Sequence, residues 1–267
     1  MITRLWQRLS IPLLLFLPGT VWAEMKKVVY GIDDFCPYTC LEKDRPGILP
    51  EAIAVILGRQ RMTLEILPGS WTRLEKEGEK GNVDLLGPLT LRFIKRTRVP
   101  STQVLGGFFK AGFMTRSDSS WIYTGPESLR NKRLVTVKGY SYPVEVKAFL
   151  DTIRDTRYLM ELSGENANRR RVQMLAQGRV DAVPTMYNIF HHQVKLLNMN
   201  AADFRSAGDM PLSDDTTTFR IGVFNKDPVV SKELIRILDK GFVDISKDKT
   251  LKSILARYGI QGEQGLN

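Results

Sequence analysis

The stretch KGNVDLLG, Lys80 to Gly87, returns later in the chain as AQGRVDAV, Ala176 to Val183. In both copies a glycine, one further residue, a valine and an aspartate lead into apolar residues. A glycine at the end of a helix adopts a left-handed backbone at little cost. The apolar residues that follow are typical of a strand buried under helices on both faces of a sheet. The repeat therefore predicts two similar α/β units in one chain.

The segments around the first copy alternate between strand and helix patterns. Residues 26–35 and 62–69 have the β-branched, apolar character of strands, and residues 48–60 and 71–81 have helical spacing. With a strand at 82–89, this order predicts a parallel sheet.

The second unit follows the same rhythm before the chain returns. The expected strands are 106–116, 133–139, 157–162 and 179–186, and the expected helical segments are 125–132, 142–153 and 164–178. A strand at 216–227 and helices at 228–246 and 249–259 complete the chain. Asp84 and Asp181 of the repeated phrase fall near strand starts, away from the edge where open α/β sheets bind ligands. We therefore favour a structural role for both, orienting the turn, over a catalytic one.

Residues 1–23 are predicted to be a cleaved secretory signal. Arg4 and Arg8 precede a short apolar run, and small residues lead to the cleavage point after Ala23. A membrane anchor is the alternative, but Pro18 interrupts the run, which is shorter than the roughly 20 residues that span a bilayer. The expected location is the periplasm, without lipid attachment because no cysteine follows the cleavage point.

The charge of the mature chain favours an anionic partner without pointing to nucleic acid. Loss of the two signal arginines lowers the formal charge from +10 to +8. The basic residues are dispersed, apart from the cluster Arg169 to Arg171, and no aromatic-rich basic stripe accompanies them. We interpret this cluster as a solvated helix face.

Two cysteines, Cys36 and Cys40, are the only ones in the chain. In an oxidising compartment they are expected to form a disulfide. A metal site is the alternative, but it requires two further ligands, and His191 and His192 are remote in the sequence.

Six segments in order resemble landmarks of the bacterial extracellular solute-binding proteins of the polar amino-acid type. They are GILPEAIAVILG, SWTRLEKEGEKGNVDLLGPLTLRFIKR, SLRNKRLVTVKGYSYP, RRRVQMLAQGRVDAV, FRIGVFNKD and DKTLKSILARYG. The resemblance covers essentially the whole mature chain. It implies a periplasmic binding protein-like fold of type II, in which two α/β lobes joined by two hinge strands close over a solute. The first lobe would comprise residues 24–111 and 214–267, and the second lobe residues 112–213.

The same resemblance indicates candidate binding residues. Family members carry an arginine twelve residues after the first repeated aspartate, where it holds the ligand's carboxylate, and this position is Arg96. Thr90 lies in the same segment and is included in the site. A solvated basic turn is the alternative for Arg96. Where amino-acid binders carry an acid for the ligand's ammonium, this chain has Met186, which argues against a standard α-amino acid.

The turn that opens the second-lobe helix departs from the family pattern by placing Tyr140 after its glycine. Ser141 follows, and its hydroxyl is expected to cap the helix, whose exposed N–H groups would receive an anion. Tyr38, Trp71 and Tyr140 are expected in loops where flat rings could sandwich a solute. The alternative for each ring is a place in the core.

We therefore expect a monomeric binding protein, with no cofactor and no catalytic residues. It would close over a small polar, carboxylate-bearing solute and present it to an inner-membrane ABC permease or a sensor. Two alternatives remain: a dehydratase-like enzyme on the same scaffold, and an accessory protein with a degenerate pocket. An enzyme would need a general acid or base aimed into the cleft, and the sequence shows no such constellation.

Overall fold

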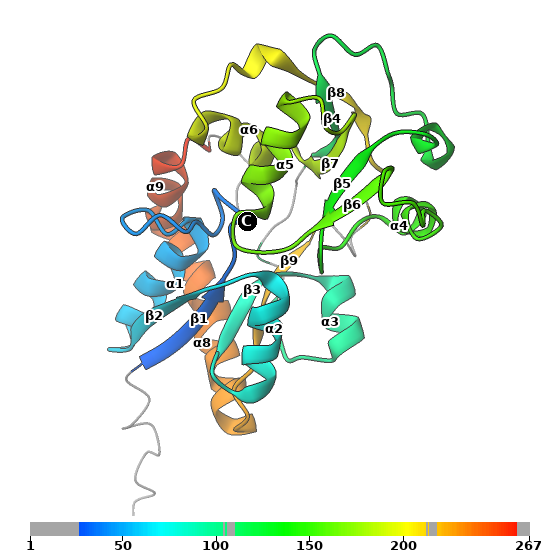
Figure 1. Ribbon diagram of the computed structural model, residues 1–267. Helices are drawn as coiled ribbons and strands as arrows, with labels where there is room; N and C mark the ends of the chain where they lie inside the picture. Colours follow the sequence, from blue (N-terminus) through cyan, green and yellow to red (C-terminus); the bar gives the residue numbers. More distant parts are fainter. Residues whose placement is uncertain (1–26, 104, 106–109, 212, 214–217, 261–267) are drawn as a thin grey trace, which may run out of the picture.

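The computed structural model describes residues 27–260 except 104, 106–109, 212 and 214–217. Two α/β lobes lie one above the other, as the resemblance implied (Figure 1). The predicted signal segment 1–23 falls outside the described residues, as does part of each predicted hinge strand. The lobe boundaries near residues 111 and 213 therefore remain predictions. Within the described part of the chain, none of the helices combines the length and apolar character required to cross a bilayer.

The first lobe is built on a four-stranded sheet in the order β2-β1-β3-β9. The strands are β1 (Lys27–Ile32), β2 (Thr63–Pro68), β3 (Leu85–Thr90) and β9 (Phe219–Val223). β1 pairs in parallel with β2 and β3, so their carboxyl ends meet at one edge. β9 pairs with β3 in the antiparallel direction, so a strand from late in the sequence completes this sheet.

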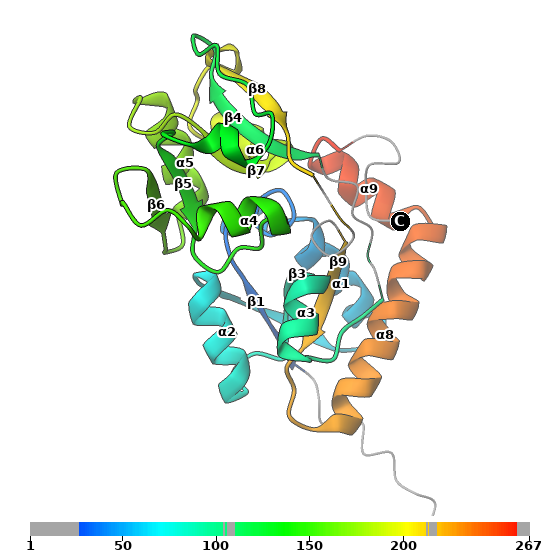
Figure 2. The same cartoon turned by 90° about the vertical axis from the view of Figure 1, so that its right-hand side faces the viewer.

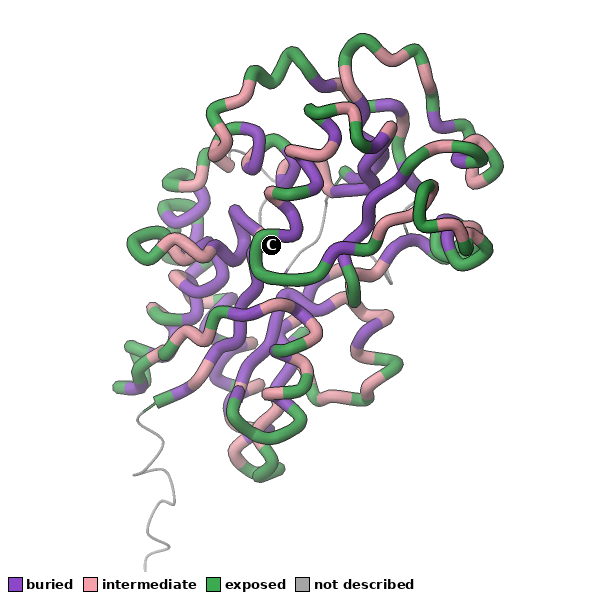
Figure 3. The backbone as a smooth tube through the Cα atoms, viewed as in Figure 1, coloured by how far each residue is buried: buried purple, intermediate pink, exposed green. Residues whose placement is uncertain are grey.

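Helices cover both faces of this sheet (Figure 2). The helices on one face are α1 (Ile48–Gly58), α8 (Pro228–Lys247) and α9 (Thr250–Arg257), and those on the other are α2 (Trp71–Lys80) and α3 (Leu91–Thr97). Tyr30 of β1 packs in the core under α1 and α8, whereas Leu86 and Leu89 of β3 pack with Leu74 of α2. The buried residues follow the strands and the inner helix faces (Figure 3).

The second lobe contains a three-stranded antiparallel sheet, β7-β4-β8, and a parallel pair, β5-β6. The strands are β4 (Ala111–Arg116), β5 (Leu134–Val137), β6 (Leu159–Leu162), β7 (Val183–Met186) and β8 (Phe204–Asp209). A bridge between Leu134 and Ala182 links the two sheets. The helical segments are η2 (Pro126–Leu129), α4 (Val144–Leu150), α5 (Ala167–Ala176), α6 (Tyr187–Leu196) and η3 (Ala201–Asp203).

The repeated phrase forms the same backbone structure in both lobes. Gly81 and Gly178 each end a helix in the left-handed region, at φ 86° and 65°. Asp84 then exchanges two hydrogen bonds with Val29: its N–H donates to the Val29 carbonyl, and its carboxylate accepts from the Val29 N–H at 2.9 Å. Asp181 makes the same exchange with Arg133, whose N–H lies 2.8 Å from the carboxylate. Both aspartates tie the start of one strand to its neighbour, so the predicted structural role is confirmed.

Four elements were not predicted from the sequence: α3, α6, η3 and β8. β8 reads FRSAGD, without the β-branched residues that indicate a strand. α6 follows β7 without an intervening loop, so its first residues read as a continuation of the strand. In addition, α4 begins at Val144 after Pro143, so the expected cap by Ser141 is wrong. The Ser141 hydroxyl instead accepts a hydrogen bond from Thr90 across the lobes.

Candidate functional site

A cavity of about 90 Å³ lies between the two lobes. Its walls are largely apolar and aromatic, and its polar groups come from both lobes. The first lobe contributes Asp33, Phe35, Trp71, Pro88, Thr90, Phe93 and Phe219, and the second lobe contributes Ala111, Gly139 to Pro143, Arg171, Pro184 to Met186, Ile189 and Met210. Apolar walls with a few polar groups that converge from two lobes are typical of a small-molecule site.

Four of the residues predicted for the site line this cavity: Trp71, Thr90, Tyr140 and Ser141. Thr90 Oγ1 accepts from the Phe93 N–H at 3.3 Å, where it caps α3, and donates to Ser141 Oγ at 3.2 Å. Trp71, the first residue of α2, packs edge-on against Phe93. The structure thus brings these four residues together, while their contact with a ligand remains a prediction.

Tyr38 does not line this cavity. Its side chain is buried in the first-lobe core, which corresponds to the alternative given for the aromatic residues. Its hydroxyl accepts a hydrogen bond of 2.6 Å from Asn188 of α6. Tyr38 therefore links the lobes beside the cavity, and a role as a ligand-contacting wall remains a prediction.

Arg96 lies outside this cavity as well. Its side chain is 62% exposed and pairs with Glu75 at 3.1 Å. The guanidinium lies 4.9 Å from the centre of the Phe93 ring, and Phe93 itself lines the cavity. Arg96 instead lines an open groove along the outside of the interface, with Arg92 and Lys147. Its predicted grip on a carboxylate would have to occur in that groove.

Among the described residues, Arg171 of α5 is the arginine that lines the cavity. It is 3% exposed, so the prediction of a solvated helix face for Arg169 to Arg171 is wrong for this residue, although Arg170 is exposed. The buried stripe of α5, which includes Asn168, Arg171, Val172 and Leu175, has helical spacing. This helical spacing in the sequence indicates that Arg171 lies on the buried face of α5, although three consecutive arginines suggest an exposed face.

The Arg171 guanidinium is only partly used by the protein. One Nη donates to the Pro184 carbonyl at 2.9 Å, and the other donates to Asn168 Oδ1. Nε is buried and has no hydrogen-bond partner among the described residues. The guanidinium carbon lies 6.0 Å from the centre of the Tyr140 ring. A buried cation with an unused donor beside a cavity provides a site for an anionic group.

Asp33 is the acid that lines the cavity among the described residues. It follows β1 directly, at the carboxyl edge where α/β sheets bind ligands. Tyr140 of the second lobe donates a hydrogen bond of 2.8 Å to its Oδ2 and accepts one of 3.0 Å from Asn168. In the sequence, the signal for this site is the pair of adjacent acids, Asp33 and Asp34, directly after a buried strand.

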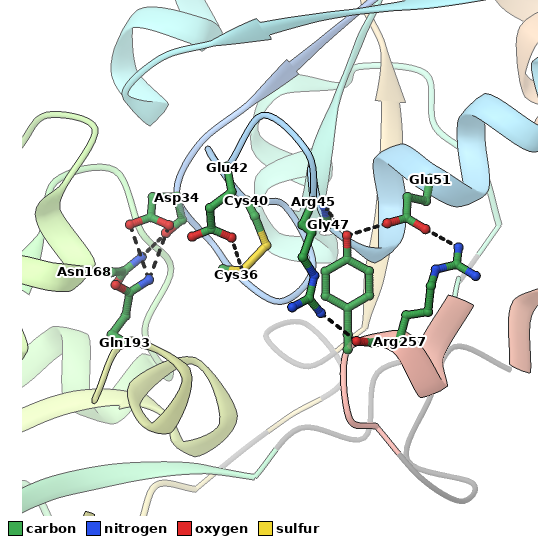
Figure 4. Close-up of a disulfide and its surroundings, with 11 residues drawn as sticks. Asp34, Cys36, Cys40, Glu42, Arg45, Gly47, Glu51, Asn168, Gln193 and Arg257 are labelled. Carbon is green, nitrogen blue, oxygen red and sulfur yellow. Dashed lines mark hydrogen bonds and ion pairs between the residues drawn. A yellow bond between two sulfur atoms is a disulfide. The ribbon is translucent and has the colours of Figure 1, made fainter. Parts of the chain in front are cut away.

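Burial controls the ionisation of both acids of this pair. Burial raises the pKa of Asp33 to about 7, although the Tyr140 hydrogen bond opposes the shift. Burial also raises the pKa of Asp34 to about 6, opposed by the charge of Arg169. Asp34 accepts from Gln193 of α6 at 3.3 Å, and its carbonyl accepts from Asn168 (Figure 4). The loop after β1 is thus held against α5 through the Asp34 carbonyl and against α6 through the Asp34 carboxylate.

Cys36 and Cys40 form a disulfide in this loop, as the sequence predicted (Figure 4). Met186, at the position where amino-acid binders carry an acid, lines the cavity at the end of β7. Asp33 enters the same cavity from the other lobe. A carboxylate is therefore present, although not at the expected position.

No protein-family model matches the sequence, and no curated protein matches it. Solved structures do resemble it. One is an ABC uptake transporter substrate-binding protein from Streptococcus pneumoniae with bound histidine, at 18% identity and TM-score 0.72, covering 93% of this chain and 99% of that one. Another is an ancestral arginine-binding protein bound to arginine, at 17% identity and TM-score 0.71, covering 87% and 98%.

A third similar structure is a histidine kinase sensor domain with similarity to periplasmic binding proteins. It is 19% identical, with TM-score 0.63, and the match covers 87% of this chain and 95% of that domain. These likenesses confirm the two-lobed periplasmic binding protein-like fold that the resemblance implied.

Proposed function

We propose that this protein is an extracytoplasmic solute-binding protein that closes its lobes over a small, carboxylate-bearing solute. The observation that carries the proposal is that Asp33 of the first lobe and Arg171 of the second lobe line the same cavity. Both side chains are buried, and burial strengthens their interaction with a charged solute because little water competes.

The two charges define the solute. The unused Nε of Arg171 offers a donor to a carboxylate, and hydrogen bonds between a guanidinium and a carboxylate are among the strong ones in proteins. Asp33 offers an acceptor to an amino group. Met186 argued against an α-amino acid because it removes an acid, but Asp33 replaces that acid from the opposite wall. We therefore include amino acids among the solutes, and similar proteins of this fold bind histidine and arginine.

Closure follows from the position of these groups. A solute that contacts Asp33 and Arg171 together interacts fully only when the lobes are closed, so binding shifts the population toward the closed state. The aromatic residues Phe35, Trp71 and Tyr140 exclude water from the same space. The closed protein would then be recognised by a membrane partner. Both an ABC permease and a sensor suit the fold, since the similar structures include a transporter component and a kinase sensor domain.

We propose binding without catalysis. Acid–base catalysis commonly uses two groups, one that donates a proton and one that accepts it. Among the described residues that line the cavity, Asp33 is the carboxylic acid, and no second carboxyl group accompanies it. Its carboxylate already accepts a hydrogen bond from Tyr140. We also propose export through cleavage after Ala23 and a monomeric mature protein.

A thermal-shift screen of the mature protein tests the proposal. The solutes are the neutral and basic amino acids, organic acids without an amino group, and amines without a carboxylate. A solute that binds the closed form stabilises the folded protein and so raises its melting temperature. At a solute concentration a hundredfold above Kd, the added free energy of unfolding is about 2.7 kcal/mol. We expect the amino acids to act and the simple amines to fail. Stabilisation by amines and not by any carboxylate-bearing solute would contradict the proposed role of Arg171.

A further inference from the structure

The disulfide of the β1–α1 loop lies beside two other metal-ligating side chains. Cys36 Sγ, Cys40 Sγ, a carboxylate oxygen of Glu42 and an imidazole nitrogen of His192 all lie within 4.8 Å of one another. Cys36 and Cys40 are buried, and Glu42 and His192 are partly buried. In the sequence, a metal site was the alternative to the disulfide, and the objection to it was that two further ligands were missing. The fold supplies both of them.

The lobe interface brings His192 to the cysteines. His192 lies on α6 of the second lobe, and its neighbours on that helix hold the first-lobe loop. Asn188 donates to the Tyr38 hydroxyl at 2.6 Å, and Gln193 donates to the Asp34 carboxylate at 3.3 Å. These contacts flank His192, so its position against the loop is determined on both sides along the helix.

The imidazole of His192 has a donor or acceptor to spare. Its Nε2 is buried and has no hydrogen-bond partner among the described residues. A neutral imidazole with an unused ring nitrogen is a common metal ligand.

We propose that the dithiol form of the chain binds Zn²⁺ through Cys36, Cys40, His192 and Glu42. Two thiolates, an imidazole and a carboxylate are all ligands that Zn²⁺ accepts in a tetrahedral site. Ligand atoms about 2.0 to 2.3 Å from a central zinc lie less than about 4 Å from one another. The present cluster is close to that spacing, and the two sulfurs separate once no bond joins them.

Zinc and the disulfide are mutually exclusive states of the two sulfurs. Zinc binding releases one proton from each thiol and transfers no electrons. Formation of the S–S bond removes two electrons, which pass to a disulfide oxidant such as oxidised glutathione, and frees the zinc. No reductant is required to reach the zinc form, because a newly made chain carries thiols. Three ligands come from the first lobe and one from the second, so zinc also joins the lobes.

Zinc titration of the whole mature protein in two redox states tests the proposal. The reduced protein, kept in a phosphine reductant, is titrated with Zn²⁺ against a chromophoric chelator, and the oxidised protein is treated in the same way without reductant. We expect one zinc per reduced chain, protection of both thiols from alkylation, and no binding by the oxidised chain. Oxidised glutathione should then release the metal.

Two adjacent histidines provide a matched pair of variants. His192→Ala should weaken zinc binding at least roughly tenfold, because even the loss of a residue that supports a ligand typically costs ten- to a hundredfold. His191→Ala, which alters an exposed side chain outside the cluster, should leave the affinity unchanged. Circular dichroism verifies that both variants are folded. Equal zinc affinity in the two redox states of the wild type, or equal effects of the two substitutions, would overturn the proposal.

Discussion

Replacing Asp33 with asparagine removes one buried ionisable group and little else. Asp33 is 6% exposed, and its carboxylate accepts a hydrogen bond of 2.8 Å from Tyr140. Asparagine has nearly the same shape, and its carbonyl oxygen can accept the same hydrogen bond. Asp33→Asn therefore tests the cost of burying this charge without removing the contact between the lobes.

The magnitude follows from the pKa of Asp33, which burial raises from 3.8 to about 7. Because the pKa is higher in the folded than in the unfolded state, the folded protein binds the extra proton between these pH values. The resulting stability is fully present below about pH 4 and is lost as the pH rises through 7. One pKa unit corresponds to about 1.36 kcal/mol. Between pH 5 and pH 8 the wild type should therefore lose about 2 to 3 kcal/mol through this group.

Urea unfolding, followed by tryptophan fluorescence at pH 5 and at pH 8, measures the effect. The difference in free energy of unfolding between Asp33→Asn and the wild type should shift by about 2 to 3 kcal/mol in favour of the variant at pH 8. Asp151→Asn is the control, because Asp151 is an exposed partner of Lys147 and should change the pH dependence by less than about 1 kcal/mol. The same pH dependence in Asp33→Asn and the wild type would refute the reasoning.

Three further predictions concern export and the frame of the lobes. Cys36 and Cys40 should form a disulfide in the exported protein, which peptide mass mapping without reductant would detect. Two alkylated thiols in that experiment would contradict the prediction. N-terminal sequencing of periplasmic protein should begin at Glu24, whereas an intact first methionine in the membrane fraction would exclude cleavage. Asp181→Ala should lower the free energy of unfolding by about 1 to 2 kcal/mol, because it leaves the Arg133 N–H without its acceptor, and should leave solute affinity unchanged. Urea unfolding and calorimetry measure the two effects, and a large loss of affinity without loss of stability would contradict a purely structural role.

The fold could be predicted because its signals are local. One short repeated segment contains the glycine that ends a helix, the strand that follows and the aspartate that accepts a hydrogen bond from a neighbouring N–H. Asp84 and Asp181 make the same contacts in the two lobes. α6 and β8 were missed because their boundaries depend on tertiary packing. β8 is a strand because it pairs with β4, and its own sequence does not favour that state.

The candidate site could be predicted only in part. Trp71, Thr90, Tyr140 and Ser141 lie in loops and helix ends whose position follows from the fold, and they do line the cavity. Arg171 was missed because the burial of a charged side chain depends on which face of its helix packs against the sheet. A cluster of three arginines in the sequence is instead typical of an exposed helix face. His192 reaches the cysteines only because the two lobes meet. Contacts between distant segments of this kind have no local signal.

The most direct test of the central claim is the affinity of one solute for two arginine variants. With a solute found in the thermal-shift screen, calorimetry is performed on the wild type, on Arg171→Met and on Arg96→Met. Loss of a charge-assisted hydrogen bond costs about 1.5 to 3 kcal/mol, so Arg171→Met should weaken binding roughly ten- to a hundredfold. Arg96→Met, which changes a largely exposed side chain outside the cavity, should have little effect. A loss of affinity in Arg96→Met that equals or exceeds the loss in Arg171→Met would contradict a carboxylate site in the cavity between the lobes.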